Sequence, residues 1–351
     1  MSADKTGVIT VGIAGLGRSG WNIHAKHIET LPEQFKIVGV TDADEGRMKE
    51  AADKFGCSTY KTYEELLADD DVEVQVVAMP SHLHAPYSIQ ALKAGKDVVC
   101  EKPMATSLAE ADEMIATSKD TGKLLSIFQN RRYAADFVKV RQVLETGKLG
   151  RVVMIRVAVH GFGRRWDWQT LKKYGGGSLN NTGPHFLDQA LQLMGGEEVP
   201  EVFCQLETTL TCGDADDHAK VVLRLDGHPM IDMEITAACP YGQDTWLVMG
   251  TQGGLTGGAK GLRWKYIDPK DLPPREVDTE PTPDRSYNRE DVPWQDEESW
   301  DPKEEPGPAG NQFYVDLYET IRNGKPLHIT PESVRRQMAV LEECHRQCPL
   351  E

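Results

Sequence analysis

The sequence has no long apolar run. No stretch of its 351 residues approaches the ~20 consecutive apolar residues that a membrane-spanning helix needs. Its first residues, Met1 to Lys5, also lack the apolar core of a secretory signal peptide. These absences argue against a membrane protein and predict a protein that remains in the cytoplasm.

Positive charge is scarce as well. The chain has 39 Lys and Arg against 55 Asp and Glu, and its formal net charge is −16 at pH 7. Nucleic acids and anionic membrane surfaces bind clustered positive charge, so neither is expected as a partner. Solubility explains the acidic surface more simply.

Cysteines are few and scattered. There are seven, an odd number, with no Cys-x-x-Cys pair, which favours reduced thiols over a disulfide framework. Cys344, His345 and Cys348 fall within one turn of a predicted C-terminal helix and could bind a metal. Because no further ligand lies nearby, we expect ordinary helix positions and no metal.

A glycine-rich loop is the most informative feature that is present. Gly15-Leu16-Gly17-Arg18-Ser19-Gly20 follows a predicted strand over 8–14 and precedes a segment compatible with a helix. The first glycine allows a tight turn, the second a close approach of pyrophosphate, and the third close packing of helix on strand. The phosphates would meet the positive end of the helix dipole. This context predicts a dinucleotide-binding loop rather than a glycine-rich turn of another kind.

An acidic residue stands where such a loop requires one. A second predicted strand, 36–41, ends at Asp42, which is 22 residues after Gly20 and near the usual interval of about 20. A carboxylate there binds the ribose 2′-hydroxyl and repels a 2′-phosphate. NAD is therefore expected rather than NADP, although Arg47 and Lys49 could reach such a phosphate.

The chain changes character near its first third. Up to about residue 129, predicted strands alternate with predicted helices, which indicates a doubly wound parallel sheet with ligands at the strands' carboxyl ends. From residue 151, apolar alternation without intervening helices indicates a largely antiparallel open sheet. The predicted strands are 8–14, 36–41, 74–79, 97–100, 124–127, 152–159, 202–210, 219–225, 230–236 and 245–249. The predicted helices are 44–55, 63–68, 88–94, 108–118, one after 175–177 that passes through His185, Asp188 and Leu191, 313–322 and 331–346. Residues 268–310, rich in Pro, Asp and Glu, predict an irregular excursion anchored by Trp294 and Trp300.

These motifs together resemble the Gfo/Idh/MocA family (glucose-fructose oxidoreductase, inositol dehydrogenase, rhizopine catabolism) over nearly the whole chain. Besides the glycine loop and Asp42, they are Pro80 with His84, Glu101-Lys102-Pro103, the Gly-rich turn before His185, the stretch 250–255 and the helix start at 330–332. The resemblance implies an α/β fold with a Rossmann NAD-binding domain, 1–129, and an α+β substrate-binding and oligomerisation domain, 130–351. It also implies cofactor contacts from the loop residues, Asp42, Pro80, His84, Glu101, Lys102 and Asn130, and a homodimer or homotetramer.

The implied reaction needs a proton acceptor. Oxidation of a secondary hydroxyl removes a hydride and a proton, so a Lys or His beside the nicotinamide is expected. Lys102 and His185 are the candidates; the alternatives are a solvated surface lysine and a buried, hydrogen-bonded histidine. The family usually has an aspartate four residues before the histidine, whereas this chain has Asn181, which cannot accept a proton. Asp188, one helical turn past His185, supplies the missing carboxylate or points into the core.

A segment before the Gly-rich turn is the candidate for substrate recognition. It contains Arg164, Arg165, Trp166 and Trp168. Arginine offers several fixed donors and tryptophan a flat face for a sugar ring. The alternative is a cation–π packed loop at a subunit contact.

Three functions follow from these expectations. The first is an NAD-dependent oxidoreductase that acts on a secondary hydroxyl of a sugar, cyclitol or related polyol. The second is a glycoside-cleaving enzyme that retains NAD and oxidises its substrate transiently before elimination or hydrolysis. The third is a non-catalytic regulator that binds NAD and sugar, against which the presence of both Lys102 and His185 speaks.

Overall fold

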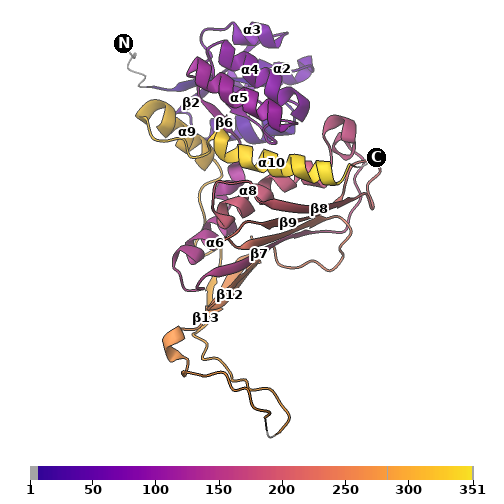
Figure 1. The fold of residues 1–351 in the computed structure, drawn as a ribbon. Coiled ribbons are helices and arrows are strands. Elements are labelled where there is room, and N and C mark those ends of the chain that lie inside the picture. Colours follow the sequence, from indigo (N-terminus) through magenta and orange to yellow (C-terminus); the bar gives the residue numbers. More distant parts are fainter. Residues whose placement is uncertain (1–6, 283, 350–351) are drawn as a thin grey trace.

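The computed structural model describes residues 7–282 and 284–349, which build two β-sheets with helices against them. The first sheet, sheet A, and its helices lie at one end of the molecule, and the second sheet, sheet B, lies below them (Figure 1). A long helix near the C-terminus runs between the two sheets. This arrangement confirms the predicted fold class.

Sheet A has the doubly wound topology that the alternating pattern predicts. Its six parallel strands have the order β3-β2-β1-β4-β5-β6, so successive strands are added on one side of β1 up to β3 and on its other side from β4 onward. The strands are β1 Ile9–Ala14, β2 Phe35–Thr41, β3 Ser58–Thr59, β4 Val74–Val77, β5 Asp97–Cys100 and β6 Leu125–Ile127. The helices are α1 Lys26–Glu29, α2 Glu45–Phe55, α3 Tyr63–Leu67, α4 His84–Lys93 and α5 Leu108–Thr121.

Sheet B has eight strands in the order β14-β13-β12-β11-β7-β10-β9-β8. Its pairs are antiparallel except for β7 with β10, which agrees with the prediction of a largely antiparallel sheet. The strands are β7 Val152–His160, β8 Glu201–Glu207, β9 His218–Arg224, β10 Met230–Thr236, β11 Trp246–Gly250, β12 Gly253–Gly258, β13 Gly261–Tyr266 and β14 Glu298–Trp300. The helices after β6 are α6 Ala135–Glu145, α7 Ser178–Asn181, α8 Gly183–Met194, α9 Gln312–Asn323 and α10 Pro331–Gln347.

Local signals set most helix starts. The side chains of Asp44, Thr62, Ser107 and Thr330 each accept a hydrogen bond from a backbone N–H in the first turn of the helix that follows. One start differs from the prediction, since α4 begins four residues earlier, at His84. Pro86 then lies in the first turn, where its missing N–H has no helical partner to lose.

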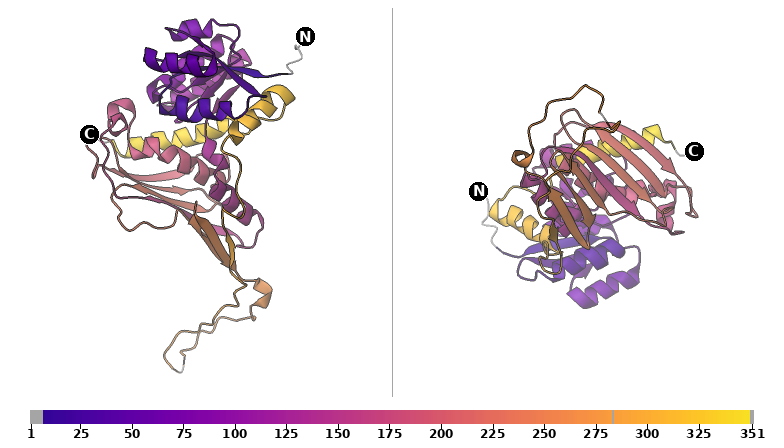
Figure 2. Two further views of the ribbon diagram at one scale, coloured as in Figure 1. Left: turned by 180° about the vertical axis from the view of Figure 1, so that it is seen from behind. Right: turned by 90° about the horizontal axis from the view of Figure 1, so that it is seen from below.

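The C-terminal helices connect the two halves. From α9, Tyr314 is fully buried and packs edge to face on Phe35 of sheet A, with ring centroids 5.4 Å apart. Helix α10 packs against α5 on one side and against α8 and β8 on the other (Figure 2). The end of the chain therefore fixes the position of sheet A relative to sheet B.

Residues 268–282 and 284–297 leave sheet B as an extended arm that projects from the body (Figure 1). The two limbs of the arm are joined by an ion pair between Arg275 and Glu290 at 2.6 Å. Of the two predicted anchors, Trp300 is buried in β14, whereas Trp294 is half exposed beneath Lys265.

Candidate active site

The glycine loop lies at the carboxyl end of β1. Gly15 has a φ of +89°, and a Cβ atom there would lie 2.6 Å from the carbonyl oxygen of Ala78, so this turn requires glycine. A Cβ atom on Gly20 would collide with the carbonyl oxygen of Gly15. At Gly17 nothing lies within 4 Å of the corresponding position. The open backbone at Gly17 is where a pyrophosphate can approach.

Asp42 faces this loop from the end of β2. Its Oδ2 accepts a hydrogen bond from the Leu16 N–H at 2.6 Å, and its Oδ1 accepts one from the Asp44 N–H at 2.9 Å. Arg47 Nη1 lies 3.6 Å from Oδ1, whereas Lys49 pairs with Asp53 instead. The structure thus brings the carboxylate and one of the two predicted cations together.

His84 joins the loops that follow β4 and β5. Its Nδ1 lies 2.6 Å from the carbonyl oxygen of Pro103, and its Nε2 lies 2.8 Å from that of Met79. The imidazole is buried, and burial lowers its pKa. His84 therefore connects the loop after β4 to the loop after β5.

Glu101 is buried behind the glycine loop, in contacts that the sequence did not predict. Its Oε1 lies 3.1 Å from Nε2 of His24, and His24 Nδ1 lies 2.7 Å from the hydroxyl of Tyr314. Burial opposes ionisation of Glu101, but the hydrogen bond and charge of His24 prevail and lower its pKa to about 2. The carboxylate also accepts a hydrogen bond from the Lys102 N–H at 2.9 Å, which fixes the lysine's backbone.

Lys102 bridges the two halves of the molecule. Its Nζ donates a hydrogen bond to the backbone carbonyl of Asn181, at the end of α7, at 3.0 Å. Burial lowers the pKa of Lys102, and the charges of Arg131 and Arg18 lower it further against the opposing effect of Glu101. The solvated surface lysine considered above is therefore not what the structure shows.

His185 lies in the first turn of α8, near Lys102. Burial, followed by the charges of Lys102 and Arg131, lowers its pKa to about 3, so the imidazole is neutral at pH 7. Its Nδ1 is buried and has no hydrogen-bond partner among the described residues. A buried nitrogen without a partner costs free energy, which is consistent with a position that a ligand completes.

Asp188 points into the core and does not replace the missing aspartate. Its two carboxylate oxygens accept hydrogen bonds from Nε and Nη2 of Arg132 at 2.7 and 2.6 Å. Both side chains are buried. Among the residues that the structure describes, no carboxylate is paired with His185, and the side chain of Asn181 is a neutral amide.

Arg131 was not predicted as a site residue. It follows Asn130 in the short helix η3, Asn130–Tyr133, and its guanidinium lies 5.4 Å from the ring centroid of Phe186. Its charge affects both Lys102 and His185. The signal in the sequence was its position directly after β6, at the same edge of sheet A as Lys102.

The predicted recognition segment is exposed. Trp166 and Trp168 are 79% and 46% exposed, and Trp168 makes an edge contact with Tyr174. Arg165 pairs with Asp167, whereas Arg164 forms no ion pair among the described residues. No cation lies over either tryptophan ring in residues 7–282 or 284–349, so the cation–π packing considered above is not formed within the chain.

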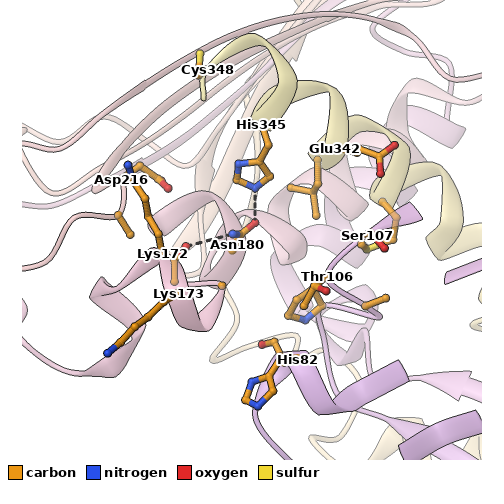
Figure 3. Close-up of a pocket in the computed structure, with 18 of the residues that line it drawn as sticks. His82, Thr106, Ser107, Lys172, Lys173, Asn180, Asp216, Glu342, His345 and Cys348 are labelled. Carbon is orange, nitrogen blue, oxygen red and sulfur yellow. Dashed lines mark hydrogen bonds between the residues drawn. The ribbon is translucent and has the colours of Figure 1, made fainter. Parts of the chain in front are cut away.

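A cavity of about 440 Å³ adjoins the site (Figure 3). It lies between the loops after β4 and β5, the segment 172–176, α7 and α10. Pro103 and Asn180 line it, and they are the neighbours in sequence of Lys102 and Asn181.

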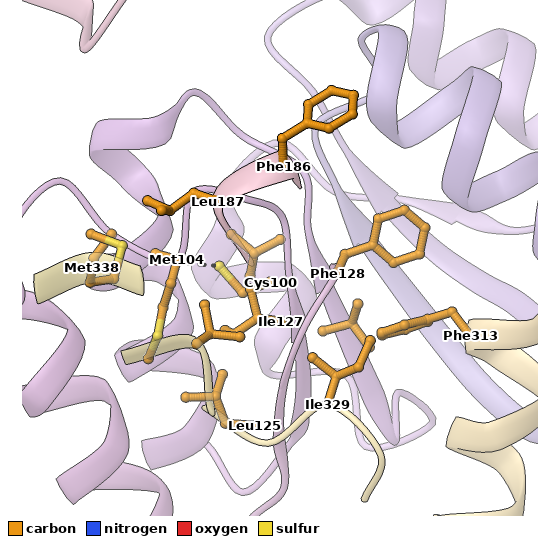
Figure 4. Close-up of a cluster of buried hydrophobic side chains, with 14 of the residues drawn as sticks. Cys100, Met104, Leu125, Ile127, Phe128, Phe186, Leu187, Phe313, Ile329 and Met338 are labelled. Atoms are coloured by element: carbon orange, nitrogen blue, oxygen red, sulfur yellow. Dashed lines mark hydrogen bonds between the residues drawn. The ribbon is translucent and has the colours of Figure 1, made fainter. Parts of the chain in front are cut away.

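An apolar cluster contains Cys100 and Met104, which flank Lys102 in the sequence (Figure 4). It contains Cys100, Met104, Ile127, Leu187 and Met338, contributed by both halves of the molecule and all buried. The thiol of Cys100 donates to the carbonyl oxygen of Glu101 at 3.3 Å. The loop is therefore held by packing as well as by hydrogen bonds.

Two further expectations concern metal and membrane. Among residues 7–282 and 284–349, no group of three or more His, Cys, Asp and Glu side chains could hold a metal ion. His345 lies 2.8 Å from Oδ1 of Asn180, and the Cys348 thiol donates to the carbonyl oxygen of Cys204. Within the same residues no helix is long and apolar enough to cross a membrane.

Comparison with known proteins gives matches to both halves of the chain. A family model described as the oxidoreductase family, NAD-binding Rossmann fold, matches residues 9–129, and one described as the GFO/IDH/MocA C-terminal domain matches residues 137–256. A myo-inositol 2-dehydrogenase of Thermotoga maritima is 31% identical over 69% of this chain and 73% of its own length. An uncharacterized oxidoreductase of Schizosaccharomyces pombe is 28% identical over 70% and 69%.

Solved structures share the fold. A putative oxidoreductase of Bacillus subtilis superposes with a TM-score of 0.81 at 20% identity, covering 97% of this chain and 96% of its own. The WlbA dehydrogenase of Bordetella pertussis, solved in complex with NADH and UDP-GlcNAcA, gives a TM-score of 0.78 at 21% identity, with 97% of both chains covered.

Proposed function

The chain belongs to the Gfo/Idh/MocA family of NAD-binding oxidoreductases, and from that premise we propose that it oxidises a secondary hydroxyl of a sugar, cyclitol or related polyol. The observation that carries this proposal is the proximity of Lys102, whose charge lowers the pKa of His185, to a neutral His185 whose Nδ1 has no partner among the described residues. The similar myo-inositol 2-dehydrogenase supports a polyol as the substrate class.

The residues present fit an NAD dinucleotide. The open position at Gly17 suits the pyrophosphate, and the Asp42 carboxylate faces the same loop, where it suits ribose hydroxyls and repels a 2′-phosphate. Arg47 lies beside Asp42 and weakens that repulsion, but the carboxylate is nearer the loop. We propose NAD as the preferred cofactor; when bound, it supplies the two-electron acceptor for the reaction.

We propose that Lys102 accepts the proton of the substrate hydroxyl. A group whose pKa lies near 3, as that of His185 does, holds a proton weakly at pH 7. Burial lowers the pKa of Lys102, which favours its free amine, and the free amine is the form that can accept the hydroxyl proton. His185 then orients the substrate oxygen through a neutral hydrogen bond, and Arg131 on the Phe186 ring offers donors to neighbouring hydroxyls.

Copies of the chain meet, we propose, across the open face of sheet B as a homodimer or homotetramer. Met154 lies in register between Met230 and Met249 on that face, which makes an apolar row across three strands. Met230 and Met249 are each 41% exposed. Exposed apolar rows of this kind mark interaction surfaces.

The experiment that tests the function is a substrate panel with NADH fluorescence as the readout. Sugars, cyclitols and other polyols are offered with NAD, and at least one is expected to give net NADH in proportion to the product. Bond cleavage without net NADH would instead support the glycoside-cleaving alternative, because the hydride is then returned. Binding of NAD and sugar with neither reaction would indicate a regulator.

A further inference from the structure

The 440 Å³ cavity beside the site has the size of a ligand site of its own. Small-molecule sites in proteins span about 300–1,000 Å³. Pro103 and Asn180, which line it, are the sequence neighbours of Lys102 and Asn181, and Lys102 Nζ donates a hydrogen bond to the backbone oxygen of Asn181. The cavity therefore adjoins the two segments that carry Lys102 and Asn181.

The lining combines apolar side chains with polar side chains. The lining includes the apolar side chains of Ala105, Ala215, Met338 and Leu341. It also includes the polar side chains of Ser107, Thr106, Asn180, Asp216, Glu342 and His345 (Figure 3). A pyranose ring presents both kinds of surface, C–H faces for apolar side chains and hydroxyls that donate and accept hydrogen bonds. Amide, carboxylate and imidazole groups match such hydroxyls.

The polar groups of the cavity are held in position before any ligand binds. His345 Nε2 lies 2.8 Å from Oδ1 of Asn180, and the amide nitrogen of Asn180 donates to the carbonyl oxygen of Gly176 at 3.2 Å. Asp216 accepts a hydrogen bond from the Leu179 N–H at 2.8 Å. Fixed polar groups lose little entropy when a ligand binds, which is typical of a built site.

The charges in the lining favour a neutral ligand. Lys172 and Lys173 lie on one side of the cavity, Asp216 lies beside Lys172, and Glu342 lies on the opposite side (Figure 3). The two signs offset each other, so a phosphate or carboxylate gains little net attraction. A second sugar unit meets both the size and the neutrality that the lining requires.

We propose that this cavity is a second sugar subsite, which binds the unit glycosidically linked to the one whose hydroxyl is oxidised. The inference rests on the proposed function and narrows its substrate class from single sugars to glycosides of at least two units. Lys102 and His185 would act on one unit, and Asn180, Asp216 and His345 would bind the other.

The test compares monosaccharides with their disaccharides in a variant whose cavity is filled. His345→Trp projects an indole into the cavity from α10, and Arg346→Ala is the matched control, because Arg346 pairs with Glu343 and does not line the cavity. We expect kcat/KM for lactose, maltose or cellobiose to exceed that for galactose or glucose in the unaltered protein. His345→Trp should lower the disaccharide value by about tenfold or more while leaving the monosaccharide value within about twofold.

Calorimetry with NAD present measures sugar binding separately from sugar oxidation. A second variant, Asn180→Ala, tests the subsite without adding an indole that could disturb folding. If no sugar is oxidised but a disaccharide binds, and His345→Trp or Asn180→Ala removes that binding, the subsite stands and the proposed oxidation fails. If monosaccharides are oxidised and no disaccharide is preferred, or both variants affect the two sugar classes equally, the subsite is refuted and the oxidation stands.

Discussion

Asn181→Asp restores the charge that the family usually places beside the histidine, and it tests how the proton is handled. Lys102 Nζ lies 3.0 Å from the backbone oxygen of Asn181, so a carboxylate on that side chain stands close to the ammonium. At about 6 Å and an effective dielectric constant near 20, a unit charge contributes about 2.8 kcal/mol, which corresponds to about two pH units.

The sign follows from the protonated forms. A carboxylate stabilises the charged forms of Lys102 and His185, so their pKa values rise. If the free amine of Lys102 accepts the proton, the acid limb of the pH dependence of kcat moves to higher pH by about one to two units. The plateau at high pH should be preserved or improved.

The assay is the pH profile of NADH formation with the best sugar of the panel. Asn288→Asp is the matched control, since it adds the same charge on the exposed arm, where the Asn288 side chain donates to Asp278 and lies in neither site. In the control variant, the acid limb of the pH profile should stay at nearly the same pH as in the unaltered protein. An Asn181→Asp variant that binds NAD and sugar normally but loses its plateau would refute the reasoning, because the neutral amide would then be required, as expected for elimination or hydrolysis.

Three further outcomes are expected. The unaltered protein should bind NAD more tightly than NADP by calorimetry, and Asp42→Ala should narrow the difference; tighter NADP binding at the outset would contradict the cofactor assignment. If Trp166 or Trp168 stacks on a sugar, substrate should change tryptophan fluorescence, and replacing that tryptophan by Ala should weaken sugar binding but not NAD binding. An unchanged sugar affinity in both Ala variants would indicate that the segment has a structural role only. Asp188→Asn should cost about 3–5 kcal/mol in urea unfolding by leaving Arg132 buried without its counter-ion, whereas Arg132→Met combined with Asp188→Leu should recover most of it; a loss below about 1 kcal/mol would contradict a buried pair.

The parts of the fold that were predictable from sequence have local causes. Strands β1, β2, β4 and β5 are short apolar runs bounded by polar or glycine residues, and each lies within two residues of its predicted limits. The cap residues before α2 and α5 mark helix starts independently of the rest of the fold. The glycine loop and Asp42 also met as predicted, because their spacing is set by one strand-helix-strand unit.

Other elements could not be predicted because tertiary contacts decide them. Strand β12 has four glycines in six residues and shows no apolar alternation; a Cβ atom on Gly253 would collide with the carbonyl oxygen of Lys265 on β13. Helix α6 was likewise not predicted. The predicted strand over 202–210 ends early, at Glu207, after which Asp217 binds the backbone of residues 209–211.

The candidate site also has a part that was predictable from sequence and a part that was not. Lys102 and His185 were named from motifs, but their environment depends on residues far along the chain. His24 lowers the pKa of Glu101 from 77 residues away in the sequence, and His24 itself contacts the hydroxyl of Tyr314, 290 residues further on. No local sequence pattern marks such contacts. The direction of Asp188 was left open by helix geometry, and the buried guanidinium of Arg132 decides it.

The measurement that bears most directly on the account compares Lys102→Ala with the unaltered protein in two assays, the NAD dissociation constant by calorimetry and kcat for the best sugar of the panel. We predict that kcat falls by about 10²-fold or more while NAD affinity stays within about twofold, because Lys102 is assigned to the reacting hydroxyl and not to the dinucleotide. Turnover close to that of the unaltered protein would contradict the assignment of Lys102 as the proton acceptor.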